Sequence, residues 1–278
     1  GTNTDFSCPR NFLRNDKFIV PKDGTAKSKT PSAFSSLSFK LRKNQEKNLY
    51  SVIGYMRSLK ALNTSIPKIT SYGYLDKKRK ENIQIIEELT ADAFTSSSSK
   101  EFNLYTKQTY LDNCLRGGYP YTFNNGASVF YLYSRKHGDP ERDYNKFQIA
   151  PTYFSQGNGN YRDLNQNRRN DIWFNPKLKE ENLLHFINLI QLDGFNPLVV
   201  KGASFILKDK EALRAGLKGF YPKEKIEKLL SFLDNPFTPG EVILYLEDNS
   251  IGLKNNYDAF LDLVVSCSLK TEEAEHSE

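Results

Sequence analysis

The sequence predicts a mainly α-helical fold, and three observations support this prediction. Apolar residues recur at helical spacing in several separate windows. Helix-capping residues and glycines stand at the ends of some of these windows. Aromatic residues make up 13% of a chain of 278 residues, which is enough to build a core and argues against disorder.

The N-terminal part is expected to be an arm followed by linker helices. Residues 1–45 are rich in Ser, Lys, Thr and Pro, so we expect them to be extended or irregular. Apolar spacing predicts one helix over residues 45–63 and another over residues 77–94. We therefore assign residues 1–95 to an N-terminal arm with linker helices.

A break and a capped helix follow. Ser99 is a candidate N-cap for a helix over residues 100–115, and Gly117–Gly118 is a candidate stop signal. Residues 127–135, "ASVFYLYSR", fit a short buried strand or an aromatic helix, and helical neighbours favour the helix. Residues 241–249 fit a helix or a strand equally well.

The remaining windows complete a second predicted domain over residues 96–278. Residues 180–195 are apolar on almost every side, which predicts a helix covered by other helices on more than one side. Two shorter helices are predicted over residues 209–217 and 222–233, the second with a proline near its start. The acidic end, residues 270–278, is expected to fray.

The net charge and the cysteines say more about the cellular compartment of the protein than about its function. The net charge of +6 suits an anionic partner, but ordinary soluble proteins also carry such a charge. Cys8, Cys114 and Cys267 are too far apart for a zinc motif and odd in number, so a reducing compartment and a cytoplasmic location are the simplest expectation. No run is long and apolar enough for a membrane span.

One polar segment carries most of the candidate chemistry. Residues 155–171 read "SQGNGNYRDLNQNRRND", with three Arg, two Asp and a series of side-chain amides. Guanidinium forks, carboxylates and amides together match the hydroxyls of a sugar or an anionic group. Arginines for phosphates and a tyrosine for stacking would also suit nucleic acid. A salt-bridged structural loop is the third interpretation.

The same segment resembles a known enzyme family. "SQGNGNYRDLNQNRR" resembles the G-x-x-x-[FY]-R-D-x-x-Q-[DN] motif of cellobiose- and chitobiose-type glycoside phosphorylases. The wider stretch over residues 95–205 is similar to the large β-1,3-oligoglucan (laminarin-type) phosphorylases. The resemblance implies an (α/α)6 barrel preceded by a β-sandwich and a helical linker. Residues 96–278 would then be the first part of that barrel, which is incomplete here.

The resemblance also implies a site and a reaction. The candidate substrate-binding residues are Arg162, Asp163, Gln166, Arg168, Arg169 and Asp171. Arg162 and Asp163 would hold the glucosyl unit, whereas the last three positions match only the β-1,3-glucan branch. The implied reaction converts β-glucan and inorganic phosphate into α-glucose 1-phosphate and a shortened glucan. Phosphate is a co-substrate, and no metal or organic cofactor is required.

The general acid of the family has no counterpart in this sequence. Cellobiose-type relatives carry it in a Gly-Asp-Trp-Asn-Asp motif that is missing here. The catalytic residue is therefore unknown, with Asp163 as the fallback, and we expect a fragment that is inactive alone. The expected partners are a β-glucan oligosaccharide and phosphate, and neither nucleic acid nor a membrane is expected. We also expect the chain to associate with the rest of the enzyme or with itself. The alternative functions are a non-catalytic carbohydrate- or polyanion-binding protein and a basic nucleic-acid binder.

Overall fold

The chain divides into two compact units, Gly1–Gly54 and Tyr55–Glu278. A computed structural model describes residues 13–14, 37–54, 56–132, 152–252, 257–272 and 274–275. In the first unit, residues 37–54 are exposed and contain a turn in which the Gln45 amide donates to the Arg42 carbonyl at 3.0 Å. The predicted boundary between residues 95 and 96 stays a prediction.

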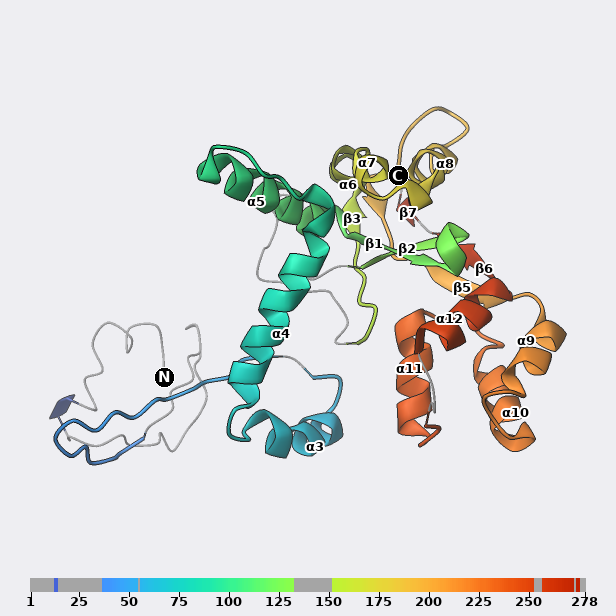
Figure 1. Ribbon diagram of the computed structural model, residues 1–278. Helices are drawn as coiled ribbons and strands as arrows, with labels where there is room; N and C mark the ends of the chain where they lie inside the picture. Colours follow the sequence, from blue (N-terminus) through green and yellow to red (C-terminus); the bar gives the residue numbers. More distant parts are fainter. Residues whose placement is uncertain are drawn as a thin grey trace. The chain divides into compact units, whose positions relative to one another are not determined.

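The second unit is built mainly from helices, shown in Figure 1. Its helices are α3 (Leu59–Ile69), α4 (Tyr74–Leu89), α5 (Lys100–Gly117), α6 (Tyr161–Arg168), α7 (Asp171–Phe174), α8 (Glu181–Asn188), α9 (Lys210–Leu217), α10 (Lys223–Phe232), α11 (Pro239–Asp248) and α12 (Tyr257–Ser266). Short 3-10 turns are η1 (Ala91–Ala93), η2 (Asn124–Gly126) and η3 (Pro176–Leu178). The mainly helical class is confirmed, while the barrel stays a prediction.

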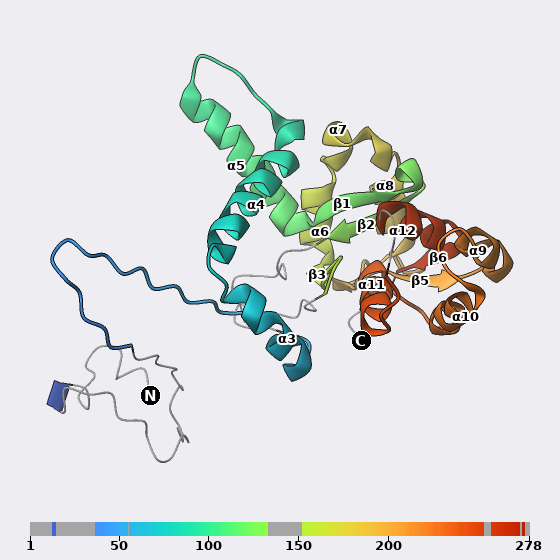
Figure 2. The same cartoon turned by 60° about the horizontal axis from the view of Figure 1, so that its bottom comes forward.

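Small antiparallel sheets connect these helices, as Figure 2 also shows. The strands are β1 (Tyr119–Phe123), β2 (Ser128–Leu132), β3 (Gly159–Asn160), β4 (Val199–Val200), β5 (Ser204–Leu207), β6 (Ser268–Thr271) and β7 (Ala274–Glu275). Strands β1 and β2 form a hairpin. Strands β3, β4 and β7 form a second sheet, and β5 pairs with β6. The last strands therefore pair with segments far earlier in the chain.

The main hydrophobic core lies among α9–α12 and the strands β1, β2 and β5. Its largest fully buried rings are Phe123, Phe130, Phe205, Phe237 and Phe260. Phe205 stacks between Phe130 and Phe237, with ring centroids 6.1 Å away on each side. A smaller core joins α6, α8 and β4 through Tyr161, Leu164, Phe186 and Val200. This smaller core fixes α6, which carries the polar segment.

The first predicted helix is wrong in position. Residues 45–54 are not helical, and the helix begins instead at Leu59, where the Ser58 side chain accepts a hydrogen bond from the Ala61 amide at 3.1 Å. Val52 and Ile53 are β-branched and Gly54 follows them, so this stretch has low helix propensity despite its apolar spacing. The second predicted helix is confirmed as α4.

Of the predictions for the middle of the chain, some are confirmed and one is wrong. Ser99 caps α5, its hydroxyl accepting from the Phe102 amide at 3.2 Å, and the helix ends at Gly117 as predicted. The helix favoured over residues 127–135 is wrong, because residues 128–132 form β2 and pair with β1. The ambiguous segment 241–249 lies in α11, where Thr238 and Glu241 form a capping box.

Further corrections concern the C-terminal half. Helix α8 ends at Asn188, and one side of it is exposed at Leu183, Leu184 and Ile187, so the prediction of burial on more than one side is wrong. The predicted helices 209–217 and 222–233 are confirmed as α9 and α10. The expected fraying of residues 270–278 is wrong for the described part, because β6 and β7 pair with earlier strands.

Of the helices that the structure describes, none combines the length and apolar character needed to cross a lipid bilayer.

Candidate functional site

The polar segment folds as a helix entered from a short strand. Asn160 caps α6, its side-chain oxygen accepting from the Arg162 amide at 3.0 Å. Gly159 is required by close packing, since an added Cβ would lie 2.7 Å from the Leu164 side chain. The Asn167 and Arg168 carbonyls accept from the Asn113 and Asn182 side-chain amides at 2.8 and 3.1 Å, so α6 ends there and α7 is a separate short helix. Most of the segment from residue 161 onward is therefore helical, with a turn at residues 169–170.

The candidate residues divide between two sides of this helix. Leu164 and Arg168 are buried and Asp171 is half-buried. The exposed residues are Arg162, Gln166 and Arg169, and Asp163 is half-buried beside Arg162. The structure therefore brings Arg162 and Asp163 together, but it does not bring all six candidates to one surface.

Arg162 and Asp163 form a contact at the start of α6. The Arg162 Nε donates to Asp163 Oδ1 at 3.2 Å, and an Nη of the same guanidinium lies 3.1 Å from that oxygen. The Arg162 side chain is 76% exposed, whereas that of Asp163 is 19% exposed. A carboxylate in the first turn of a helix interacts favourably with the helix dipole. The pair thus offers hydrogen-bond donors and acceptors side by side.

Arg168 holds α6 against its neighbours. Its Nε donates to the Gly117 carbonyl at 2.7 Å, and its guanidinium carbon lies 3.5 Å from the centre of the Tyr131 ring. The Asn182 amide donates to the Arg168 carbonyl at 3.1 Å. Because Arg168 is only 4% exposed, this arrangement ties α6 to α5, β2 and α8. The predicted ligand contact of Arg168 stays a prediction.

Asp171 accepts a hydrogen bond from the Tyr131 hydroxyl, whose oxygen lies 3.1 Å from Asp171 Oδ2. The same hydroxyl lies 2.7 Å from Asn182 Oδ1 and has one proton, so it donates to one oxygen at a time. Burial raises the pKa of Asp171 to about 6, although the Tyr131 hydroxyl and the Arg168 charge act in the opposite direction. Burial also raises the pKa of Tyr131 well above its ordinary value.

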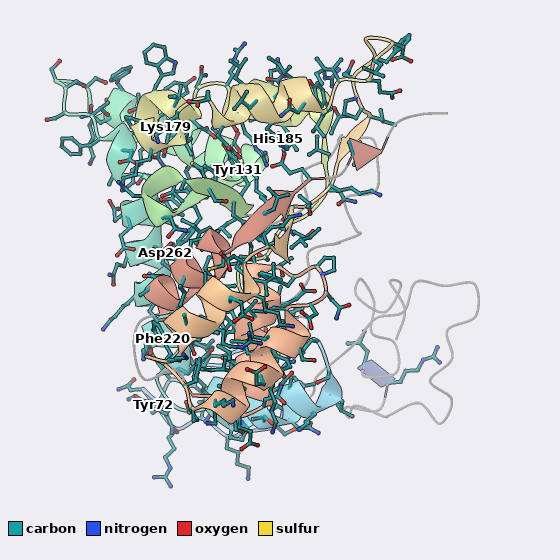
Figure 3. The ribbon with its side chains drawn as sticks, turned by 90° about the vertical axis from the view of Figure 1, so that its right-hand side faces the viewer. Tyr72, Tyr131, Lys179, His185, Phe220 and Asp262 are labelled. Atoms are coloured by element: carbon teal, nitrogen blue, oxygen red, sulfur yellow. The ribbon has the colours of Figure 1, made fainter. Side chains whose placement is uncertain are left out.

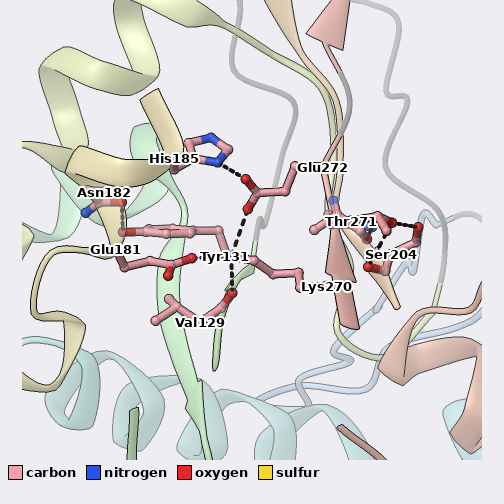
Figure 4. Close-up of polar contacts among 11 residues, drawn as sticks. Val129, Tyr131, Glu181, Asn182, His185, Ser204, Lys270, Thr271 and Glu272 are labelled. Carbon is pink, nitrogen blue, oxygen red and sulfur yellow. Dashed lines mark hydrogen bonds and ion pairs between the residues drawn. The ribbon is translucent and has the colours of Figure 1, made fainter. Parts of the chain in front are cut away.

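A second polar cluster joins α8 to the last strands, as Figure 4 shows. His185 Nδ1 contacts Glu272 Oε2, and Lys270 Nζ lies 2.8 Å from Glu272 Oε1. Lys270 also donates to Glu181 and to the Val129 carbonyl. Burial alone would raise the pKa of Glu272, but the His185 hydrogen bond and the Lys270 charge outweigh it and lower the pKa to about 2.

These partners were not found in the sequence. Figure 3 labels Tyr131 and His185 near one another. The Tyr131 hydroxyl contacts Asp171 of the candidate segment and Asn182 of α8, whereas His185 belongs to α8 itself. His185 is buried in α8, with 8% of its surface exposed. Lys270 and Glu272 lie in the acidic tail that was expected to fray. No spacing in the sequence connects them to α8, because strand pairing alone brings them there.

Among the residues that the structure describes, no group of three or more His, Cys, Asp or Glu side chains is placed to hold a metal ion. The groups that can bind a ligand in the candidate segment are the guanidinium, carboxylate and amide side chains of α6. Comparisons of the chain with protein-family models, with curated proteins and with solved structures found no match.

Proposed function

We propose that this chain is a portion of an inverting glycoside phosphorylase that acts on β-glucan and contributes the segment that binds the transferred glucosyl unit. In this proposal α5–α12 belong to the opening part of an (α/α)6 barrel. The observation that carries the proposal is the Arg162–Asp163 pair at the exposed start of α6. It supports the proposal because the resemblance to glycoside phosphorylases centres on this Arg-Asp pair.

The proposed chemistry suits these side chains. Vicinal hydroxyls of a pyranose both donate and accept hydrogen bonds, so a carboxylate beside a guanidinium can bind an adjacent pair. Asp163 would accept from one hydroxyl while Arg162 donates to the next. Phosphate is an anionic nucleophile, so an inverting phosphorylase needs no general base to activate water. It still needs an acid to protonate the leaving oxygen, and the family motif for that acid is missing from this sequence.

The helix under this pair would keep the binding groups in place. Arg168 and Asp171 anchor the opposite side of the segment to β2 and α5, and Leu164 packs in the smaller core. A site built on an anchored helix loses less conformational entropy on binding than one built on a loop. In this proposal Arg168 and Asp171 position α6, while Arg162, Asp163 and Gln166 contact sugar.

Calorimetric titration of the chain with glucose and laminaribiose tests the proposal. We expect weak binding that Asp163→Ala abolishes, because the variant removes the carboxylate that accepts from a sugar hydroxyl and pairs with Arg162. Asp76→Ala is the matched control, since it removes an exposed first-turn carboxylate from a different helix, α4. Equal binding by wild type and Asp163→Ala would contradict the proposal. We also expect no formation of glucose 1-phosphate by the isolated chain, and steady turnover would show that the acid lies within it.

The second candidate is a non-catalytic protein that binds carbohydrate or a polyanion. The exposed guanidiniums of Arg162 and Arg169, the net charge of +6 and the missing acid motif favour it. A polyanion would bind with an affinity that falls steeply as salt is added, because each phosphate contact releases counterions. Binding of neutral laminaribiose has no such dependence, so titrations at low and high salt separate the two functions.

A further inference from the structure

A row of exposed side chains follows the sequence along α6 and past a turn into α7. Arg162, Gln166 and Arg169 stand at helical spacing, and Trp173 continues the row into α7. A turn at Arg169 and Asn170 separates the two helices, and Trp173 follows it in the short helix α7. With about 1.5 Å of rise per residue, the part of the row from Arg162 to Arg169 spans about 10 Å, and Trp173 lies beyond it. That length exceeds one sugar ring and suits several units of an extended chain.

The groups of this row are available to a ligand. No hydrogen bond or ion pair within the described ranges engages the side chains of Gln166 or Arg169, and both are exposed. Trp173 is 80% exposed. Its neighbour Phe174 is only 37% exposed and packs on Tyr110 with ring centroids 4.6 Å apart. Helix α7 therefore holds one ring for packing and leaves the larger ring in solvent.

An exposed indole beside unengaged polar side chains is a binding surface of defined chemistry. The indole is the largest apolar side chain, and its flat face loses contact with water when a ring stacks on it. A pyranose has an apolar face of C–H groups and an edge of hydroxyls. Trp173 can cover that face, while Arg169 and Gln166 donate to hydroxyls along the edge. In the order of the sequence, three polar side chains precede the aromatic ring.

We propose that Trp173 is a platform for the glucosyl units of a β-glucan chain that continue from the unit bound at Arg162 and Asp163, with Gln166 and Arg169 between them. This inference rests on the proposed function and adds the direction of the chain and the residue that sets its length preference. A sugar chain suits this row because it offers an apolar ring face to Trp173 and hydroxyls to the polar side chains.

The single tryptophan makes the inference directly measurable. Trp173 is the only tryptophan in the sequence, so its emission reports on this surface alone. We expect laminaripentaose to bind more tightly than glucose and to shift the emission to shorter wavelength as the ring stacks on the indole. Calorimetry should show that Trp173→Ala weakens pentaose binding about tenfold, equivalent to about 1.4 kcal/mol. The affinity of Trp173→Phe for pentaose should lie between those of wild type and Trp173→Ala.

Two controls separate this inference from the proposed function. Trp173→Ala should leave glucose binding within about twofold, and Tyr72→Ala, which removes a fully exposed ring from the connection between α3 and α4, should match wild type. If Trp173→Ala binds pentaose as wild type does, the platform is wrong and the glucosyl site stands. If wild type binds no sugar, both are wrong. Salt-sensitive binding of single-stranded RNA that shifts the emission, without any sugar effect, would also overturn the platform.

Discussion

Two carboxyl groups near α8 experience opposite electrostatic environments. Asp171 is half-buried beside a hydroxyl donor and a nearby guanidinium, and desolvation prevails, so its pKa rises to about 6. Glu272 is also half-buried, but His185 and Lys270 both contact it and lower its pKa to about 2. The difference follows because the Lys270 ammonium contacts Glu272 directly, whereas Asp171 accepts a hydrogen bond from a neutral hydroxyl. Because the two pKa shifts are opposite in direction, they make the stability of the fold change with pH in opposite directions.

The free energy of unfolding should rise with pH over one range and fall with pH over another. Glu272 has a lowered pKa, so its contribution is complete above pH of about 4.5 and is lost as the pH falls towards 2. Asp171 has a raised pKa, so the folded state binds its proton more tightly and stability falls as the pH rises from about 4 to 6. We expect maximal stability from these two groups near pH 4.5, measured by urea unfolding at a series of pH values.

Two amide variants assign these slopes. Glu272→Gln should lower the free energy of unfolding at pH 6 by about 3 kcal/mol, because Lys270 and His185 lose a buried partner. This difference should vanish towards pH 2. Asp171→Asn should flatten the slope between pH 4 and 6, since the amide carries no charge and can still accept from Tyr131. A Glu272→Gln effect that stays constant with pH would show that packing and not charge is lost.

At the scale of elements, helix boundaries were predicted correctly where a capping residue lies next to the helix in the sequence. Ser99 begins α5 and glycine ends it, because a cap satisfies backbone groups with atoms only a few residues away. The same holds for α9, where Asp209 caps the first turn. These boundaries could be predicted without knowing what the helices pack against.

Tertiary pairing decided the elements that the sequence did not predict. Residues 128–132 are apolar and aromatic, and pairing with β1 makes them a strand. Lys270 and Glu272 look like part of a polar tail until β6 pairs with β5 and places them beside α8. Likewise, the sequence predicted a polar cluster over 155–171, but only packing shows which side of α6 is anchored. Contacts between residues far apart in sequence leave no local pattern.

The cap of α5 gives an element-scale prediction. Ser99→Ala should reduce the free energy of unfolding by about 1 kcal/mol, because the Phe102 amide loses its acceptor. Ser98→Ala is the matched control: it lies next in sequence, is exposed, and should change stability by less than about 0.5 kcal/mol. Hydrogen exchange of the first-turn amides of α5 should accelerate in the first variant only. Similar effects of the two variants would show that the cap is unimportant.

At the scale of the whole second unit, apolar surface remains exposed along α8 and the loop after it. The exposed large residues there are Leu183, Leu184, Ile187, Ile190, Leu192, Phe195 and Leu198. Monomeric proteins seldom expose so many neighbouring apolar side chains, and such surfaces favour association. This is consistent with the expectation that the chain associates with itself or with a further part of an enzyme.

We expect the chain to self-associate as its concentration increases, measured by light scattering after size-exclusion chromatography. Ile187→Lys should reduce the apparent mass, because it places a charge in the apolar surface of α8. Asn188→Lys adds the same charge at an exposed polar neighbour and should behave as wild type. A monomer at every concentration, or an equal effect of both variants, would contradict this role of the surface.

The pairing of β6 and β7 with β5 and β4 has a consequence for synthesis of the chain on the ribosome. The partners of Thr271 and Ala274 are Ser204 and Val200, so two of the sheets stay open until the last of these residues leaves the exit tunnel. Until then α8 lacks Glu272 and Lys270, and in a nascent chain stalled before residue 268 His185 would lack its Glu272 partner. Chaperones that recognise unfinished polypeptides would therefore meet these open sheets until residue 275 has been synthesised.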